Sequence, residues 1–445
     1  MNAQTPREKT LIVGVELTGR RRSDSTGAPF ESDPEESLDE LAVLAESAGA
    51  DVLGRALQGR PSLDPATLVG SGKVEEIRQR AVADEIDTVI FNHELSPTQL
   101  RNLERLLPAK VVDRTQLILD IFARRARTAE GQLQVELAQL NYLLPRLAGR
   151  GVQMSRLGGG IGTRGPGETQ LETDRRLIGK RISKLKSEIE RVRATRGVQR
   201  SQRQAVPLST ISLVGYTNAG KSTLFNRLTS ADVLADERMF ATLDPIVRQI
   251  RLPSQRRVLL SDTVGFIRDL PTTLVDAFRA TLEEVTAAAL LLHVVDVSSP
   301  VASEQTEHVL RVLAEIGAEG TRQILVLNKS DRLSEPDKLL DLPTLTHRIL
   351  GETARQSATA AVLVSAQTGV GIDGLLAVID QELQQDPVAR QMFRLPLGEG
   401  RALHLLHDRA AVISKVYKDE YCEVVADAPQ SLRDKLAEFA VEAAP

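Results

Sequence analysis

The chain contains no tryptophan, and aromatic residues make up only 3% of its 445 residues. Its one cysteine, Cys422, excludes an internal disulfide framework and suits a reducing compartment. Six histidines form no metal-binding pattern, and a surface or packing role explains His404 and His407 best. No apolar run approaches a bilayer span, and no basic start precedes an apolar block. We therefore expect a cytoplasmic protein without a membrane span, associated with membranes at most peripherally.

Positive charge is concentrated in one part of the chain. The formal net charge is −4, yet residues 146–204 carry 15 Lys and Arg against five Asp and Glu. The rest of the chain is therefore acidic. A basic region on an acidic protein indicates an electrostatic contact with a phosphate backbone such as that of RNA. The length allows two to four domains, each able to bury its own core.

Two apolar stripes with helical spacing lie in and before this basic region. The first, on a helix expected over about 128–147, consists of Leu133, Leu137, Leu140, Leu144 and Leu147. The second follows a heptad and consists of Leu171, Ile178, Ile182, Leu185, Ile189 and Val192. Two such helices bury their stripes most simply against each other. We therefore predict an antiparallel helical hairpin, a short coiled coil.

A glycine-rich loop, residues 149–168, connects the two stripes. It is longer than a helical hairpin needs. Its glycines permit close backbone approach, and Arg150, Arg156 and Arg164 can contact phosphates, so the loop suits insertion into structured RNA. A solvated linker without a binding role is the alternative.

Residues 215–222, Gly-Tyr-Thr-Asn-Ala-Gly-Lys-Ser, have the sequence of a phosphate-binding loop. An apolar run of strand type precedes them, and a helical stretch follows. The glycines let backbone N–H groups surround a phosphate chain, Lys221 supplies positive charge, and the Ser222 hydroxyl can bind Mg²⁺. The expected nucleotide contacts of this loop are Gly215, Tyr216, Thr217, Asn218, Ala219, Gly220, Lys221, Ser222 and Thr223.

A guanine-reading box follows a second apolar run, residues 324–327. The box is Asn328-Lys329-Ser330-Asp331, and Asp331 can accept from the ring N1–H and the exocyclic amine that adenine lacks. Ser365 and Ala366, after the strand-like run 361–364, are similar to the loop that closes over the base. We therefore expect GTP and GDP as the bound nucleotides.

Two further boxes are suited to Mg²⁺ and the γ-phosphate. Asp262-Thr-Val-Gly265 resembles the second switch of a P-loop GTPase, in which the Asp holds Mg²⁺ through water and the Gly amide senses the γ-phosphate. The stretch 240–245 offers Thr242 as the threonine that the first switch supplies to Mg²⁺, with an ordinary loop as the alternative. We predict a GTPase in which Lys221, Thr242 and Gly265 act in hydrolysis, and Ser222, Thr242 and Asp262 hold Mg²⁺.

Phe266 occupies the position where many GTPases have the Gln that orients the attacking water, and an apolar ring cannot do this. In GTPases with that replacement, an Asn at the position of Asn218 often helps to bind potassium, whose charge stands in for an arginine finger. We hypothesise slow intrinsic hydrolysis that K⁺ or a partner accelerates. The alternative is that Asn218 only hydrogen-bonds within its loop.

The flanking segments indicate two further domains. Before the hairpin, strand-like runs at 11–15, 52–54, 88–91 and 110–112 alternate with helical patterns at 38–48, 74–83 and 97–107. Such alternation predicts a small parallel α/β unit. After the GTPase region, short strands and a final helix at 431–440 predict a compact α+β unit. The expected fold class is thus a multidomain α/β protein, divided into an N-terminal domain (1–112), a hairpin (113–205), a P-loop GTPase domain (206–385) and a C-terminal domain (386–445).

Several motifs outside the GTPase boxes are distinctive. They are Phe-Asn-His-Glu-Leu-Ser-Pro at 91–97 with Arg-Asn-Leu-Glu at 101–104, Asp-Arg-Thr-Gln-Leu-Ile-Leu-Asp-Ile-Phe-Ala at 113–123, Glu-Gly-Gln-Leu-Gln-Val-Glu-Leu-Ala-Gln-Leu at 130–140, and Gly-Gly-Gly-Ile-Gly-Thr-Arg-Gly-Pro-Gly-Glu-Thr-Gln-Leu-Glu at 158–172. With these motifs the chain resembles the bacterial HflX family of GTPases over nearly its whole length.

The resemblance implies a ribosome-associated GTPase that binds the large subunit and its RNA and, with GTP bound, splits stalled or idle ribosomes under stress. It also implies that the glycine-rich tip reaches towards the peptidyl-transferase region. Some members are said to hydrolyse ATP through the N-terminal region, where this sequence shows no phosphate loop. We expect a monomer. Two alternatives remain. One is a GTPase of ribosome assembly or RNA modification. The other is a ribosome- or RNA-binding module in which the bound nucleotide only tunes the affinity.

Overall fold

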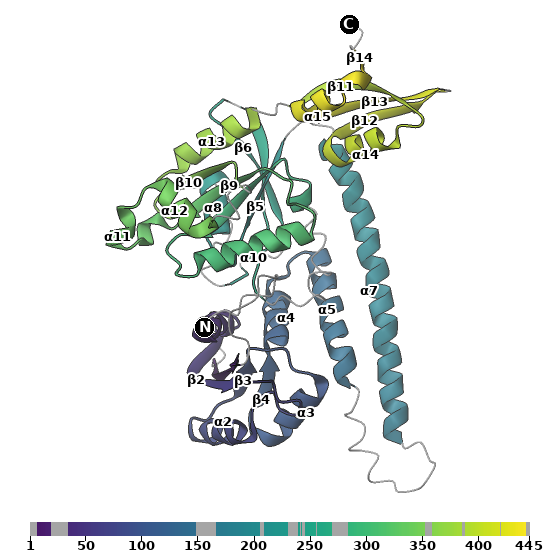
Figure 1. Ribbon diagram of the computed structural model, residues 1–445. Coiled ribbons are helices and arrows are strands. Elements are labelled where there is room, and N and C mark those ends of the chain that lie inside the picture. Colours follow the sequence, from purple (N-terminus) through teal and green to yellow (C-terminus); the bar gives the residue numbers. More distant parts are fainter. Residues whose placement is uncertain are drawn as a thin grey trace, which may run out of the picture. The chain divides into compact units, whose positions relative to one another are not determined.

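The structure is a computed structural model that describes residues 7–18, 34–147, 166–204, 209–229, 239–240, 242, 245–254, 256–268, 284–351, 358–384, 388–418 and 420–441. Its contacts divide the chain into two compact units (Figure 1). The first unit comprises Met1–Glu190 together with Asp236–Leu243 and Asp269–Phe278, and the second unit contains the rest. Among the described helices, none combines the length and apolarity needed to cross a membrane.

The first unit is built on a parallel four-stranded sheet with the order β2-β1-β3-β4. Its strands are β1 (Glu8–Leu17), β2 (Ala50–Arg60), β3 (Thr88–Phe91) and β4 (Lys110–Asp113). The helices around it are α1 (Pro34–Ser47), α2 (Ser71–Ala83), α3 (Pro97–Leu106) and α4 (Arg114–Arg125). β2 extends well beyond the apolar run 52–54, because it pairs with β1 along its whole length although several of its residues are exposed. Backbone pairing, not hydrophobicity, decides its extent.

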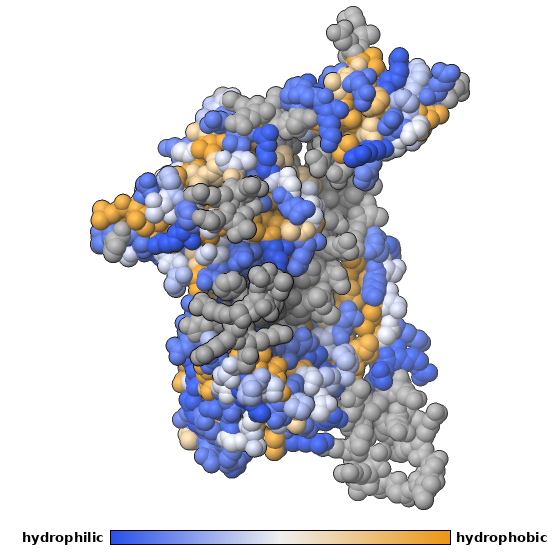
Figure 2. Space-filling view, in the orientation of Figure 1, coloured by the Kyte–Doolittle hydropathy of each residue, from blue (hydrophilic) through white to orange (hydrophobic). Residues whose placement is uncertain are grey.

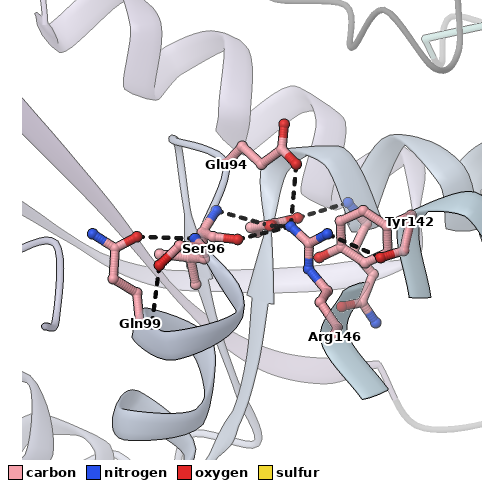
Figure 3. Close-up of polar contacts among 8 residues, drawn as sticks. Glu94, Ser96, Gln99, Tyr142 and Arg146 are labelled. Atoms are coloured by element: carbon pink, nitrogen blue, oxygen red, sulfur yellow. Dashed lines mark hydrogen bonds and ion pairs between the residues drawn. The ribbon is translucent and has the colours of Figure 1, made fainter. Parts of the chain in front are cut away.

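A buried polar network joins the next helix, α5 (Ala129–Leu147), to the end of the sheet (Figure 3). The Arg146 guanidinium donates to the Leu95 carbonyl at 2.7 Å and pairs with Glu94 at 3.1 Å and with Asp113 at 3.3 Å. It also lies 3.5 Å from the centre of the Tyr142 ring. Burial raises the pKa of Asp113, against the opposing effect of Arg146 and of the N–H donors to its carboxylate. The network fixes the C-terminal end of α5.

The next described helix after α5 is the long helix α7 (Pro166–Gln204) (Figure 1). Arg181 of α7 donates two hydrogen bonds of 2.7 Å to Glu136 of α5. In the second stripe Leu185 and Ile189 are buried, whereas Leu171 lies outside the residues with described side chains. The leucine stripe of α5 is only half-buried. Its most buried face is a different one, formed by Glu130, Gly131, Gln134, Val135, Ala138 and Tyr142.

The second unit contains a six-stranded sheet with the order β10-β9-β8-β5-β7-β6, parallel except for β6. Its strands are β5 (Thr210–Gly215), β6 (Ile246–Arg251), β7 (Arg257–Asp262), β8 (Leu290–Asp296), β9 (Gln323–Asn328) and β10 (Ala360–Leu363). One face packs against α8 (Lys221–Thr229) and α13 (Ile372–Gln384). The other packs against α10 (Ala302–Glu315) and α12 (Leu342–Leu350). Between these helices lie the short elements η1 (Ser330–Arg332) and α11 (Glu335–Lys338).

The last part of the second unit forms an antiparallel sheet with the order β12-β13-β11-β14. Its elements are β11 (Val388–Pro396), α14 (Gly400–Arg409), β12 (Ala411–Tyr417), β13 (Tyr421–Pro429), α15 (Gln430–Lys435), η2 (Ala437–Phe439) and β14 (Ala440–Val441). The expected helix over 431–440 is wrong beyond Lys435. Residues 440–441 instead pair with β11, and this long-range pairing overrides local helix propensity.

Candidate nucleotide-binding site

The phosphate loop runs from the end of β5 to the start of α8, as the sequence predicts (Figure 1). Gly215 has φ +148°, and a Cβ there would lie 2.2 Å from the Val294 carbonyl oxygen. Gly220 has φ +94°, and its Cβ would lie 2.2 Å from the Asn328 amide nitrogen. Both positions therefore require glycine, because backbone conformation and close contact each exclude a side chain.

Lys221 is buried, and carbonyl oxygens of its own loop orient its ammonium group. Nζ donates to the Gly215 oxygen at 3.0 Å and to the Tyr216 oxygen at 2.7 Å. An ammonium group has three N–H donors, so these carbonyls leave one for a phosphate oxygen. Burial lowers the pKa of Lys221 to about 8, with Asp262 opposing the shift and Lys329 adding to it. A polyphosphate would supply the countercharge that this buried cation needs.

Ser222 and Asp262 come together at the loop. The Ser222 hydroxyl donates to the Asp262 carboxylate at 2.7 Å, and Asp262 is fully buried at the end of β7. Hydroxyl and carboxylate oxygens are the donors that Mg²⁺ takes, together with phosphates and water. No cluster of three or more His, Cys, Asp or Glu side chains suited to a metal exists in the described part of the chain. This pair therefore fits an Mg²⁺ ion that a nucleotide and water help to coordinate.

The residues predicted to read the base gather at the ends of β9 and β10. The Asn328 amide donates to the Ala219 carbonyl at 2.9 Å and accepts from the Ala366 N–H at 2.9 Å. Its side chain thus ties the phosphate loop to the loop after β10. The exposed Asp331 carboxylate accepts from the Ser365 hydroxyl at 2.5 Å. This bond orients Asp331, which can still receive donors from guanine on its remaining lone pairs.

The two switches are attached to different units. Thr242 belongs with Asp236–Leu243 to the first unit, whereas Asp262 and Gly265 belong to the second unit with the phosphate loop. Next to Thr242, the Met239 N–H donates to the Ser47 hydroxyl at 3.0 Å. The structure therefore does not bring Thr242 into one unit with Ser222 and Asp262, and its role stays a prediction.

Sequence reasoning missed several residues around the site. His293 is buried on β8, His308 lies on α10 near the second switch, and Phe122 packs against the ring of Phe240. No motif marks them, since each acts through a partner that is distant in sequence. A second glycine-lysine stretch, Gly-Ser-Gly-Lys at 70–73, lies at the start of α2, where Lys73 pairs with Glu76 at 2.7 Å.

A phosphate loop, a guanine box and the second switch on one mostly parallel sheet define the class of P-loop GTPases. Three family models match the chain: GTP-binding GTPase N-terminal at 35–123, GTP-binding GTPase Middle Region at 125–203, and 50S ribosome-binding GTPase at 210–329. The relative "GTPase HflX" of Caldanaerobacter subterraneus is 45% identical over 92% of this chain and 91% of its own. The Escherichia coli protein of that name is 47% identical over 82% and 83%. The chain belongs to the HflX family of GTPases, which confirms the resemblance, and it is an enzyme that hydrolyses GTP.

A solved structure, the SsGBP and GDP complex, is 26% identical to this chain with a TM-score of 0.48, covering 85% of this chain and 99% of that one.

Proposed function

We propose that this GTPase binds the large ribosomal subunit and splits stalled or idle ribosomes, with GTP hydrolysis resetting it. The match of residues 210–329 to the model of 50S ribosome-binding GTPases carries the proposal. It is supported by the family relationship and by the basic hairpin. We further propose that the four sequence-defined parts, 1–112, 113–205, 206–385 and 386–445, are its functional domains, and that the protein acts as a cytoplasmic monomer.

The hairpin is the part that we assign to ribosomal RNA. Arg175, Arg176, Lys180 and Lys186 of α7 are exposed, and Figure 2 shows hydrophilic surface on part of this helix beside an apolar strip. Neutralising phosphates with such cations releases counterions, so affinity for RNA falls steeply with added salt. The glycine-rich tip, residues 149–165, lies outside the described residues. Its insertion into the subunit therefore rests on its sequence alone.

For the chemistry, we propose that Ser222, Thr242 and Asp262 hold Mg²⁺, which neutralises charge that develops on the phosphates. Lys221 adds its charge to the outer phosphates, and the Gly265 N–H senses the γ-phosphate. Asn218 is exposed with φ +60°, and we assign to it a potassium ion that compensates for the missing Gln at Phe266. Asn218→Gly keeps the left-handed backbone and removes the side chain. The measurement is the ratio of GTP turnover in K⁺ to GTP turnover in Na⁺. An equal ratio in this variant and in the wild type would exclude the assignment.

GTP turnover in potassium buffer, with and without purified large subunits, tests subunit binding. We expect strong stimulation by the subunit and none with Lys221→Ala. Charge reversal at Arg175, Lys180 and Lys186 should weaken association and flatten its salt dependence by roughly one unit of slope for each phosphate that the helix no longer neutralises. Arg311→Glu, Arg401→Glu and Lys435→Glu together make the matched control, because they change net charge equally on residues exposed elsewhere. Equally weakened binding in both triple variants would contradict a specific role for the hairpin.

Splitting itself is read from the conversion of 70S particles to subunits in density gradients. Deleting residues 158–167 should abolish splitting and leave GTP binding intact. Retained splitting would exclude the tip as the splitting element. Stimulated hydrolysis without splitting in the wild type would favour an assembly or RNA-modification GTPase instead.

A further inference from the structure

The second switch is attached to the phosphate loop by its backbone. The Phe266 N–H donates to the Gly215 carbonyl at 3.1 Å, and the Thr217 N–H donates to the Phe266 carbonyl at 2.7 Å. Residues 216 and 266 thereby form a short parallel bridge. The N–H of Thr217 belongs to the loop that we assign to phosphates, and here a protein carbonyl already uses it.

The side chains of Tyr216 and His308 extend this attachment to the next two residues, 267 and 268. The Tyr216 hydroxyl accepts from the Arg268 N–H at 2.9 Å. His308 Nε2 lies 3.0 Å from the Ile267 carbonyl oxygen, and because a carbonyl only accepts, Nε2 carries the proton. The Tyr216 and His308 rings pack edge to face with centroids 6.2 Å apart. Residues 266–268 are thus held at four points. We call these contacts the switch II clamp, because they hold the second switch (switch II).

The clamp brings the switch against the groups that take the outermost phosphate. A Cβ added to Gly265 would lie 2.9 Å from Lys221 Nζ and 2.9 Å from Thr217 Cα. A γ-phosphate between Lys221 and the Gly265 N–H needs the space that this approach removes. A nucleoside diphosphate has no such group. The clamp and the γ-phosphate therefore compete, while the clamp and a diphosphate are compatible.

We propose that Tyr216 and His308 are specificity-determining residues that shift the protein's preference from GTP towards GDP by holding switch II on the phosphate loop. A ligand shifts a conformational equilibrium only by its differential affinity for the two states. Triphosphate binding opens the clamp and breaks these hydrogen bonds. The free energy lost with them weakens binding of the triphosphate but not of the diphosphate. The proposal rests on the assignment of residues 215–223 as the phosphate loop.

The test compares dissociation constants for GDP and for a non-hydrolysable GTP analogue, at fixed Mg²⁺ and K⁺, in the full-length chain. His308→Ala removes one neutral hydrogen bond, so the ratio of analogue to GDP dissociation constants should fall roughly three- to tenfold. GDP affinity should stay within about twofold. His308→Gln is the matched control, because its side-chain N–H can still donate to the Ile267 carbonyl and should restore the wild-type ratio. Tyr216→Phe, which loses only the hydroxyl, should lower the ratio by a similar factor.

Three results would overturn the proposal: an unchanged ratio in His308→Ala and Tyr216→Phe, equal changes in both dissociation constants, or a glutamine variant that behaves like alanine. Equal changes would indicate a structural role only. Lys221→Ala separates this failure from failure of the site itself. If that variant bound both nucleotides as tightly as the wild type, the phosphate-loop assignment would be wrong whatever His308 does.

Discussion

The two switches differ in what holds them. The described residues of the first switch pack into the first unit, where Phe240 meets Phe122 of α4 with ring centroids 4.6 Å apart and Met239 is bonded to Ser47 at the end of α1. The second switch is bonded to the phosphate loop of its own unit. We expect both loops to respond to the same nucleotide, yet one is anchored mainly by a buried aromatic ring and the other by polar backbone contacts.

This difference predicts anchors of different strength. Phe240 has φ +57°, a conformation that a bulky side chain rarely adopts. Such a backbone persists only where its surroundings enforce it, and here the ring is buried. Burying an aromatic ring contributes more free energy than any one of the four hydrogen bonds that hold the second switch. We therefore expect the conformation of the first switch to depend on packing in the first unit, and that of the second switch to depend on the bound nucleotide.

Lys221→Ala should have the largest effect. It should slow GTP hydrolysis without loosening the contacts that hold either switch. Removing a charge that faces the phosphates costs roughly 10² to 10³ in turnover. Steady-state GTP hydrolysis measures the loss. Hydrogen exchange at the Met239 amide, in the absence of nucleotide, should be unchanged. Faster exchange there would mean that the first switch depends on the phosphate loop.

Phe240→Ala should break the first anchor. Truncating a buried phenylalanine costs roughly 3 kcal/mol, so exchange at the Met239 amide should accelerate by about 100-fold if local opening limits it. Phe240→Leu keeps most of the apolar contact and serves as the control. The Phe266 amide should keep its wild-type exchange rate. Parallel acceleration at Phe266 would contradict independent anchoring of the switches.

Low pH should lower the free energy of unfolding of the second unit, because of His293. Burial, with a smaller effect of Lys221, lowers the pKa of His293 to about 4. The unfolded chain has an ordinary histidine pKa near 6.5. The unfolded state therefore takes up a proton first, and this contribution to stability is complete above pH 6.5 and is lost as pH falls towards 4. At pH 4.5 the loss is about 2 to 3 kcal/mol.

Urea unfolding at pH 7.5 and at pH 4.5 measures this dependence. The drop in unfolding free energy between the two pH values should be about 2 to 3 kcal/mol smaller in His293→Gln than in the wild type. Comparing the two drops removes the contribution of the carboxylates, which both proteins share. Equal drops would show that His293 is protonated alike in the folded and unfolded chains.

Ser47→Ala should have the smallest effect. It removes one hydrogen bond to the Met239 N–H, worth about 1 kcal/mol, so exchange at this amide should rise by two- to tenfold. The ratio of GTP-analogue to GDP affinity should not change, in contrast to His308→Ala. Ser47→Thr, which keeps a hydroxyl, is the control. A changed nucleotide ratio in Ser47→Ala would show that the first anchor also discriminates between nucleotides.

Local patterns predicted much of the fold. The phosphate loop and the guanine box lie at strand ends, where apolar runs bounded by Gly, Asp or Asn indicated them, and β3 spans 88–91 as expected. The helix at 431–440 and the buried face of α5 were predicted less well. There the outcome depends on a partner elsewhere in the chain, namely β11 for residues 440–441 and α4 for α5.

The sequence by itself determined the class of enzyme. Phosphate, guanine and Mg²⁺ each require particular groups at short spacing, and residues 215–222, 262–265 and 328–331 supply them contiguously. Only the tertiary structure decided how those loops are held. Asn328 bridges two loops, Phe240 packs in another unit, and His308 reaches the second switch from α10. These roles arise from contacts between residues far apart in the chain, which leave no local spacing for a sequence to reveal.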